Sequence, residues 1–395
     1  MTFFFYLFLF LIFYTYIGYP VLIAFVSQFF REDGKGKMER GKSKAEDNSQ
    51  PFSIIHSPFS VSIIIPAYNE EEAIAQKLEE VLAFDYPKDK LDVMVVSDCS
   101  VDRTDEIVRG FESRGVRLLR MEKRGGKIAG YKAAVAQAAG EILVFSDATS
   151  RMEPGGLKKL LRPFADPDVG VVAGRLVYID PKKADIAKGE QTYWSYEGRI
   201  KDWEEKIFSL TSVSGTFYGV RKELFPLEMA NDLADDLIVV LNCVLHGKRA
   251  VLEKEAVCRE YAIHADSAEV NKRSRITVQN LRGLFSMPRM MDPFKFGWYA
   301  VLIISHKLLR ALVPVFLVGV LISNIFIVEQ WWMFRLILVA QIGFYMLGAL
   351  ASVWQDKRPR WLNIIYYFCV SNLAILWGII RFLRGERMAT WETAR

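Results

Sequence analysis

EILVFSDATS, residues 141–150, is the stretch around which the rest of the chain is arranged. Four apolar residues, Ile142 to Phe145, end abruptly in polar residues, a pattern typical of a strand buried on both faces. Glu153 and Pro154 then open a helix. Asp147 therefore stands at the carboxyl end of a predicted parallel strand, where open α/β sheets bind ligands. A lone aspartate there can equally be a turn or N-cap residue, so the neighbouring segments must decide.

The segments on both sides alternate between strand and helix patterns. Because parallel strands need crossover helices, this alternation predicts an α/β fold with a doubly wound, mostly parallel sheet. Polar loops follow the first, second and fourth strands, which is the usual position of a nucleotide site in such a sheet. The predicted strands cover residues 61–65, 91–97, 116–120 and 141–146, and the predicted helices cover 71–83, 104–111 and 127–139.

Beyond residue 150 the pattern is looser. Asp235 and Asp236 fall in the first turn of a predicted helix that begins near Leu233. They either cap that helix, where each would contribute about 0.3–1 kcal/mol, or supply a carboxylate for chemistry. The other predicted elements are strands at 169–173, 175–179 and 249–252, a strand ending at Val220, a helix from Tyr193 towards Phe208 and a helix over 268–284.

Both ends of the chain are strongly apolar. Residues 3–30 carry no charge before position 31, which is long enough to cross a hydrocarbon core of about 30 Å. A basic start and a small-residue cleavage site are missing, so this segment indicates a retained anchor instead of a signal peptide. The sequence predicts an anchor (1–30), a charged flexible linker (31–58), a soluble domain (59–290), an interfacial segment (291–308), transmembrane helices (309–328, 332–352 and 362–382, within 309–383) and a basic tail (384–395).

Composition excludes several classes of function. A net charge of +5 is too small to indicate nucleic-acid binding and fits an anionic lipid surface better. The four cysteines form no C-x-x-C pair, which argues against zinc and against a disulfide framework. The tail and the loop at 355–360 are basic, so the positive-inside rule places both inside. One N-terminal and three C-terminal spans would instead place both termini outside, and this conflict puts the span count in doubt.

Acidic residues stand at the ends of several predicted elements that face one edge of the sheet. These are Asp98, Asp147, Asp235 and Asp236. Together they indicate a nucleoside diphosphate held with a hard divalent cation, Mg²⁺ or Mn²⁺, because these ions take oxygen ligands and bridge phosphates. Lys127 follows two glycines at a helix start and is suited to lie beside the diphosphate, although a solvated lysine would look the same.

Seven motifs then follow one another over residues 59–285. They are VSIIIPAYNEE (61–71), VVSDCSVDRT (95–104), RGGKIAGYKAA (124–134), VFSDATS (144–150), SGTFYGVRKELF (214–225), ADD (234–236) and QNLRG (279–283). In this order and spacing the chain resembles the family 2 glycosyltransferases of GT-A fold, in particular the membrane-anchored group related to cellulose and hyaluronan synthases.

The resemblance implies a role for each matching position. Asp147 would bind the metal, Asp236 would deprotonate the acceptor hydroxyl and Asp235 would stand beside it. Gln279 and Arg282 match the family's Q-x-x-R-W and would hold the diphosphate or close a lid over it. The residues that would border the uridine of a UDP-sugar are Pro66, Tyr68, Glu70 and Asp98.

Two positions depart from the family pattern. The family's D-x-D reads Asp147-Ala-Thr149, so one metal ligand becomes a neutral hydroxyl or is replaced by water or phosphate. Gly283 stands where the family has tryptophan beside the acceptor, which weakens the case for processive synthesis.

The resemblance and the chemistry together predict a metal-dependent, inverting glycosyltransferase. We expect a multi-pass protein of the cell (inner) membrane whose catalytic domain is cytoplasmic. It would transfer a sugar from a nucleotide sugar to a lipid-linked or growing glycan in polysaccharide biosynthesis, with the bilayer and subunits of a synthase complex as further partners. Alternatives are transfer of one sugar to polyprenyl phosphate and an inactive nucleotide-binding scaffold. A transporter is disfavoured because the apolar segments carry almost no buried charge.

Overall fold

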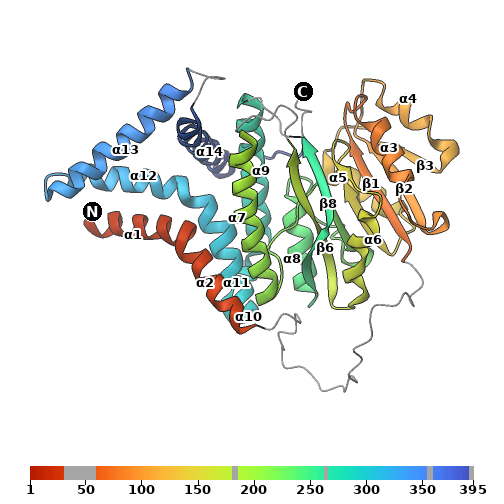
Figure 1. Ribbon diagram of the computed structural model, residues 1–395, viewed down its shortest axis with the longest axis horizontal. Helices are drawn as coiled ribbons and strands as arrows, with labels where there is room; N and C mark the ends of the chain where they lie inside the picture. Colours follow the sequence, from red (N-terminus) through yellow and green to blue (C-terminus); the bar gives the residue numbers. More distant parts are fainter. Residues whose placement is uncertain (31–58, 180–185, 262–265, 354–358, 391–395) are drawn as a thin grey trace.

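The computed structural model joins an α/β domain to a group of long apolar helices (Figure 1). It describes residues 1–30, 59–179, 186–261, 266–353 and 359–390. The predicted linker at 31–58 lies outside the described residues, as do 354–358 of the predicted basic loop and 391–395 of the predicted tail.

The domain is built on a mixed sheet with the strand order β3-β2-β1-β4-β7-β6-β8-β5 among the described residues. Strands β3, β2, β1 and β4 are parallel, β7 is antiparallel to both β4 and β6, and β6 is parallel to β8. The predicted doubly wound, mostly parallel sheet is thereby confirmed. The strands are β1 (Val61–Ala67), β2 (Leu91–Ser97), β3 (Val116–Arg120), β4 (Ile142–Ser146), β5 (Arg151–Met152), β6 (Val169–Ile179), β7 (Phe217–Arg221) and β8 (Arg249–Tyr261).

Helices cover both faces of this sheet. On one face α3 (Ile74–Leu82), α4 (Thr104–Arg109) and α6 (Gly156–Leu161) pack on Ile63 and Ile65 of β1. On the other face α5 (Lys127–Gln137) and α8 (Asp235–Leu245) pack in the cluster that contains Ile64. Successive residues of a strand point to opposite faces, so the unbroken apolar run of β1 follows directly from burial on both sides.

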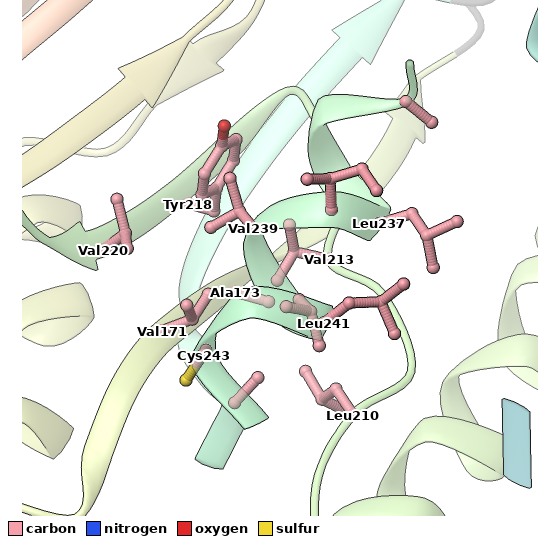
Figure 2. Packing of buried hydrophobic residues seen from close by; sticks show 14 of the residues in the cluster. Val171, Ala173, Leu210, Val213, Tyr218, Val220, Leu237, Val239, Leu241 and Cys243 are labelled. Carbon is pink, nitrogen blue, oxygen red and sulfur yellow. The ribbon is translucent and has the colours of Figure 1, made fainter. Parts of the chain in front are cut away.

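Helix α8 is buried on nearly every side. Figure 2 shows its residues Leu237, Val239, Leu241 and Cys243 among side chains of the neighbouring strands, including Ala173 of β6. A helix that is apolar all round belongs in a core. The core therefore fixes the position of its first turn, which carries Asp235 and Asp236.

Some predicted boundaries in the second half of the sheet were wrong. The strands predicted at 169–173 and 175–179 are one strand, β6, whose pairing with β8 shifts register between Gly174 and Arg175. Such a bulge interrupts the alternation of side chains, which explains the apparent break. Strand β8 extends to Tyr261 instead of 252 because it pairs with β6 along this length. Helix α7 (Ile186–Ile207) begins seven residues before the predicted Tyr193.

Four helices of the described chain are long and apolar enough to cross a membrane, and they cover Thr2–Phe29, Trp298–Ile327, Trp332–Ala351 and Trp361–Leu383. The second begins before the predicted 309 because residues 298–308, predicted to be interfacial, continue into it. Their elements are α1 (Thr2–Phe13), the π-helical η1 (Tyr14–Gly18), α2 (Tyr19–Val26), α11 (Trp298–Leu302), the π-helical η8 (Ile303–Leu309), α12 (Arg310–Ile327), α13 (Trp332–Ala351) and α14 (Arg360–Leu383).

Helix α7 and helix α9 (Asp266–Ser286) stand between the sheet and the apolar helices (Figure 1). Helix α1 runs beside α12, and a Cβ built at Gly319 would lie 2.6 Å from the Phe8 ring, so these two helices approach closely. The remaining helical pieces are α10 (Pro293–Phe296) and the 3₁₀ turns Ser27–Phe29, Lys88–Lys90, Glu112–Arg114, Arg162–Ala165, Lys222–Leu224 and Pro288–Met291.

Candidate functional site

The candidate site lies at the carboxyl edge of the parallel strands. Because β1, β2 and β4 are parallel, their final loops meet at one edge, and the antiparallel β7 brings its amino end to the same edge. The Asp147 N–H donates to the Thr216 carbonyl oxygen at 3.2 Å across this edge. The first turn of α8 follows nearby, because Val213 N–H donates to the Asp236 carbonyl oxygen at 3.1 Å.

The loops after β1 and β2 are bound to each other. Asn69 and Cys99 adopt left-handed backbone conformations, with φ of 54° and 64°, which are uncommon outside glycine. The Val101 N–H donates to Asn69 Oδ1 at 2.9 Å, and the Glu70 N–H donates to Thr104 Oγ1 at 2.8 Å. Backbone strain of this kind persists where surrounding bonds fix it, and it clusters at functional sites. The two loops therefore form one shaped rim.

Asp98 uses its carboxylate to hold the glycine loop. It is 1% exposed, and its two oxygens accept the N–H groups of Gly125 at 2.7 Å and Gly126 at 2.9 Å. Helix α5 starts directly after this loop at Lys127. Asp98 therefore positions the start of α5, which is a task that the sequence did not predict for it.

The residues predicted to border a base lie at the adjacent ends of β1 and β2, and two of them are buried. Pro66 is buried inside β1, where it pairs with Val96, and Asp98 faces the glycine loop. Tyr68 and Glu70 lie in the partly exposed loop. The Arg124 guanidinium carbon lies 3.7 Å from the centre of the Tyr68 ring, which is a cation–π contact between the glycine loop and the loop after β1.

Lys127 and Asp147 form an ion pair at the centre of the edge. Lys127 Nζ lies 2.8 Å from Asp147 Oδ1 and donates to the Gly215 carbonyl oxygen at 3.1 Å. Burial opposes the charge on Lys127, but Asp147 and Asp235 outweigh it, and the pKa of Lys127 is raised above its ordinary value. The lysine therefore stays charged at any physiological pH.

Asp235 and Asp236 join this ion pair around Gly215. A Cβ built at Gly215 would lie 3.5 Å from Lys127 Nζ, 3.8 Å from Asp235 Oδ2 and 3.9 Å from Asp236 Cβ. The Tyr218 hydroxyl donates to Asp235 Oδ2 at 3.3 Å. Burial, and next the charge of Asp235, raise the pKa of Asp236 to about 6. The raised pKa of Asp236 suits this carboxylate to proton transfer near neutral pH.

Lys77 supports the loop that carries Asp147 from inside the protein. The sequence pattern did not indicate Lys77 as a site residue. Its side chain is fully buried, and Nζ donates to Ser146 Oγ at 2.8 Å, Ser150 O at 2.9 Å and Ser150 Oγ at 3.1 Å. Burial lowers the pKa of Lys77 to about 8. These bonds join the two ends of the loop that carries Asp147. The sequence feature that could have indicated Lys77 is its charge within the otherwise apolar stripe of α3, beside Leu78.

Gln279 binds the segment that follows α14, whereas Arg282 pairs with Asp232 just before α8. Gln279 Nε2 donates to the Met388 carbonyl oxygen at 2.7 Å, and Arg282 Nε lies 2.9 Å from Asp232 Oδ2. A Cβ built at Gly126 would lie only 2.0 Å from the Ala389 carbonyl oxygen. Residues 387–389, which we call the tail segment, therefore cover the glycine loop. The sequence gave no signal for this contact.

Gly283 stands at a close approach of α9 to α8. A Cβ built there would lie 3.1 Å from Leu237 Cδ2 and 3.3 Å from Ile238 Cδ1. A tryptophan at this position would displace the helix that carries Asp235 and Asp236. The departure from the family pattern thus has a packing reason.

Asp147 is the carboxylate at this edge of the sheet that is placed to bind a divalent ion. Among the described residues no group of three or more His, Cys, Asp or Glu side chains could hold a metal ion. Asp147 is partly exposed, and the hydroxyl-bearing Thr149 is exposed two residues later. Mg²⁺ and similar ions are often held by one or two carboxylates together with substrate phosphates. Asp147 therefore fits an ion that is shared with a bound diphosphate, not one enclosed by protein ligands alone.

Comparison with known proteins relates part of this domain to one family of glycosyltransferases. Residues 62–226 match the family model described as Glycosyl transferase family 2. Over 175 residues, 42% of the chain, it is 29% identical to a probable glycosyltransferase, YdaM, of Bacillus subtilis, covering 41% of that protein. Over 133 residues, 33% of the chain, it is 32% identical to the glycosyltransferase AglE of Haloferax volcanii, covering 43% of that protein. The match thus spans less than half the length of each of these relatives.

The fold extends further than the sequence match. The mannosyltransferase PcManGT from Pyrobaculum calidifontis, solved in complex with GDP-Man and Mn²⁺, superposes with a TM-score of 0.67 at 20% identity. The superposition covers 95% of this chain and 98% of that chain. Residues 62–226 therefore match a family 2 glycosyltransferase model, and the described chain shares a GT-A-like fold that includes the apolar helices.

Gly126→Ala should release the tail segment from the glycine loop. The new methyl group meets the Ala389 carbonyl at a distance that no contact tolerates, at a backbone φ of +84°. Gly115→Ala is the matched control, because Gly115 has a φ of +90° and no atom within 4 Å of its built Cβ. We expect limited trypsin digestion to cut after Arg387 at least five-fold faster in Gly126→Ala only. Equal cleavage in both variants would contradict the contact.

Proposed function

We propose that this chain, which carries a family 2 glycosyltransferase domain, transfers a sugar from a nucleoside diphosphate sugar to a membrane-associated acceptor with inversion. The observation that carries the proposal is the gathering of Lys127, Asp147, Asp235 and Asp236 around Gly215 at the carboxyl edge of the sheet. This edge is where α/β sheets bind nucleotides.

Asp236 is the proposed base. A sugar hydroxyl is a poor nucleophile, so a positioned carboxylate must accept its proton as the bond to the anomeric carbon forms. The raised pKa of Asp236, about 6, leaves it ionised at neutral pH and yet basic enough to accept that proton. Asp235 beside it maintains this pKa, and attack from the side opposite the diphosphate inverts the anomeric centre.

Lys127 is the proposed counter-charge for the leaving diphosphate. Negative charge grows on the phosphate oxygens as the sugar leaves, and a fixed ammonium stabilises it more in the transition state than before. A divalent ion, Mg²⁺ or Mn²⁺, would be held by Asp147 and would add charge stabilisation of the same kind. Gln279 and Arg282 act on this region through the tail segment and Asp232, while Tyr68 and Glu70 border the base.

The donor base, the metal and the acceptor are parts of the proposal that need direct tests. Resemblance to the cellulose and hyaluronan synthase group favours UDP, whereas PcManGT was solved with GDP-Man and Mn²⁺. We propose a lipid-linked or growing glycan as the acceptor, in polysaccharide biosynthesis at the cell membrane, because the apolar helices adjoin the domain.

We further propose that the domain and the tail segment share the cytoplasmic side. The tail segment bonds to Gln279 of the domain, so an even number of helices after the domain must cross the membrane. Helices α12 and α13 would cross, and α14 would lie along the surface against α9, where a Cβ at Gly378 would meet Thr277 at 2.7 Å. This arrangement also places the basic loop near 355–360 inside, as the positive-inside rule requires.

The activity is tested by nucleotide release from the full chain in detergent. We expect UDP or GDP release from one member of a panel of UDP- and GDP-sugars with Mn²⁺ or Mg²⁺, reduced at least 100-fold in Asp236→Asn and by EDTA. Exposed Asp168 offers a matched control as Asp168→Asn, which should keep full activity. Failure of every nucleotide to bind would refute the nucleotide site.

The pH dependence should follow Asp236. The rate should fall as the pH drops through about 6, because protonation removes the base, and it should stay level above that value. Asp235→Asn removes the negative charge that helps to raise the pKa of Asp236, so the acid limb should move to lower pH. A limb that stays in place in Asp235→Asn would exclude Asp236 as the titrating group.

Cysteine labelling in a cysteine-free chain tests the proposed topology. Thr390→Cys in the exposed end of the tail and Val101→Cys in the domain should react with an impermeant maleimide from the same side of sealed vesicles. Glu329→Cys, in the exposed turn between α12 and α13, should react from the opposite side. Labelling of Thr390→Cys together with Glu329→Cys would show that α14 crosses.

A further inference from the structure

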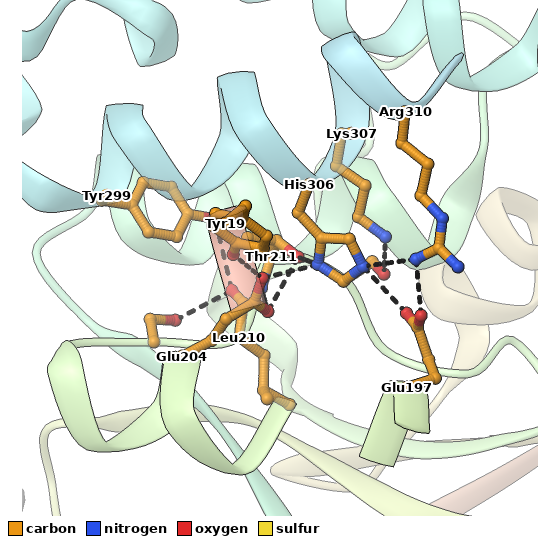
Figure 3. Close-up of polar contacts among 11 residues, drawn as sticks. Tyr19, Glu197, Glu204, Leu210, Thr211, Tyr299, His306, Lys307 and Arg310 are labelled. Atoms are coloured by element: carbon orange, nitrogen blue, oxygen red, sulfur yellow. Dashed lines mark hydrogen bonds and ion pairs between the residues drawn. The ribbon is translucent and has the colours of Figure 1, made fainter. Parts of the chain in front are cut away.

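A network of buried charges joins the domain to the second apolar helix. Figure 3 shows His306 of η8 between two glutamates of α7. His306 is 3% exposed, its Nδ1 lies 2.5 Å from Glu204 Oε1 and its Nε2 lies 3.0 Å from Glu197 Oε1. Arg310 Nη1 lies 2.6 Å from Glu197 Oε2. We call Glu197, Glu204, His306 and Arg310 the clamp.

The clamp corrects the expectation that the apolar segments carry almost no buried charge. Glu204 also accepts the Tyr19 hydroxyl at 2.7 Å and the Thr211 hydroxyl at 3.0 Å, so the N-terminal helix is tied to the same point. Every carboxylate of the clamp therefore has partners within the clamp or beside it. Buried charges need such pairing to be tolerated, and the result is a fixed position for η8 against α7.

Two lysines, Lys201 on α7 and Lys307 on η8, have no carboxylate as an ion-pair partner among the described residues. Lys201 shares the face of α7 that carries Glu197 and Glu204, because it lies four residues after one and three before the other. Lys307 follows His306 on η8, and its ammonium donates to the Ser212 hydroxyl (Figure 3). In the described part of the chain neither lysine has a carboxylate within ion-pair distance, and both are only partly exposed.

Both lysines act electrostatically on Asp236 from elements that adjoin the apolar helices. Ser212 precedes Val213, whose N–H donates to the Asp236 carbonyl oxygen at 3.1 Å. The charged groups that act on Asp236 are Asp235 of α8, Lys307 of η8, Lys127 of α5 and Lys201 of α7. Of these three cations only Lys127 has an ion-pair partner among the described residues, Asp147, so Lys201 and Lys307 are the two that can meet an incoming anion.

We propose that Lys201 and Lys307 bind a phosphate or diphosphate group of the acceptor beside Asp236. This inference rests on the proposed transferase function and narrows its acceptor to an anionic class. Unpaired ammonium groups are costly to bury, and a phosphate would satisfy both as point charges. The clamp keeps the two lysines at the junction with the apolar helices, where a lipid would present its phosphate.

Binding to the purified full chain in maltoside detergent tests this without any turnover. The probes are geranylgeranyl phosphate, geranylgeraniol with the same chain and no charge, and glucose 1-phosphate. Their affinities are measured by thermophoresis at low and high salt. We expect geranylgeranyl phosphate to bind at least ten-fold tighter than the alcohol, with a preference that high salt weakens. Tighter binding of glucose 1-phosphate than of the lipid would assign the lysines to a soluble phosphate. Equal affinity for lipid phosphate and alcohol would overturn the proposal.

Variants assign the effect to the two lysines. Lys201→Met and Lys307→Met should each reduce the preference for phosphate over alcohol at least ten-fold, while the exposed Lys206→Met on the same helix should keep it. Lys307→Arg retains the charge and should retain most of the preference, which guards against a folding defect in Lys307→Met. A full preference in both Met variants would refute the assignment. UDP and GDP binding, measured on the same samples, reports separately on the proposed donor site.

Discussion

The two hydrogen bonds from Gly125 and Gly126 to Asp98 set the geometry of the candidate site. A carboxylate at the end of β2 thereby fixes where α5 begins, and Lys127 is the first residue of that helix. The same glycine loop receives the tail segment through Gly126. Displacement of Asp98 would therefore move the lysine that faces Asp147 and the surface on which the tail segment rests.

The site and its support use buried charge in different ways. Lys77 is fully buried, so its pKa falls even though Glu80 lies 3.8 Å away, and its three hydrogen bonds hold the Asp147 loop. Asp236 is partly buried beside a like charge, and both raise its pKa. Glu204 is also buried, yet His306 and other donors keep its pKa low in spite of burial. Burial disfavours the charged form of all three groups. The neighbouring charges then decide the direction in which each pKa moves.

The long apolar helices are part of the construction of the candidate site. The clamp ties α7 to the apolar helix that begins at Trp298, and α8 is packed beneath them in a core that includes Tyr299 and Ile303. At the other side, α14 packs on α9 and delivers the tail segment to the glycine loop. Apolar helices therefore border the candidate site on two sides, within one packed unit.

The sequence alone determined the features that depend on local pattern. Strand 91–97 was predicted at its observed bounds because a buried parallel strand is a short apolar run that ends in a polar loop, and the partly exposed edge strand 116–120 was also predicted at its bounds. The order of the parallel strands placed Asp98 and Asp147 at one edge of the sheet, and the apolar runs predicted four long helices.

The tertiary structure decided what depends on partners distant in the chain. Examples are the turn of Asp98 towards Gly125, the bonds of Lys77 to Ser150, the bulge that joins two predicted strands, the pairing of His306 with Glu197 and Glu204, and the contact of Gln279 with Met388. Periodicity records which face of an element is buried, but it does not record which remote polar group will meet it there.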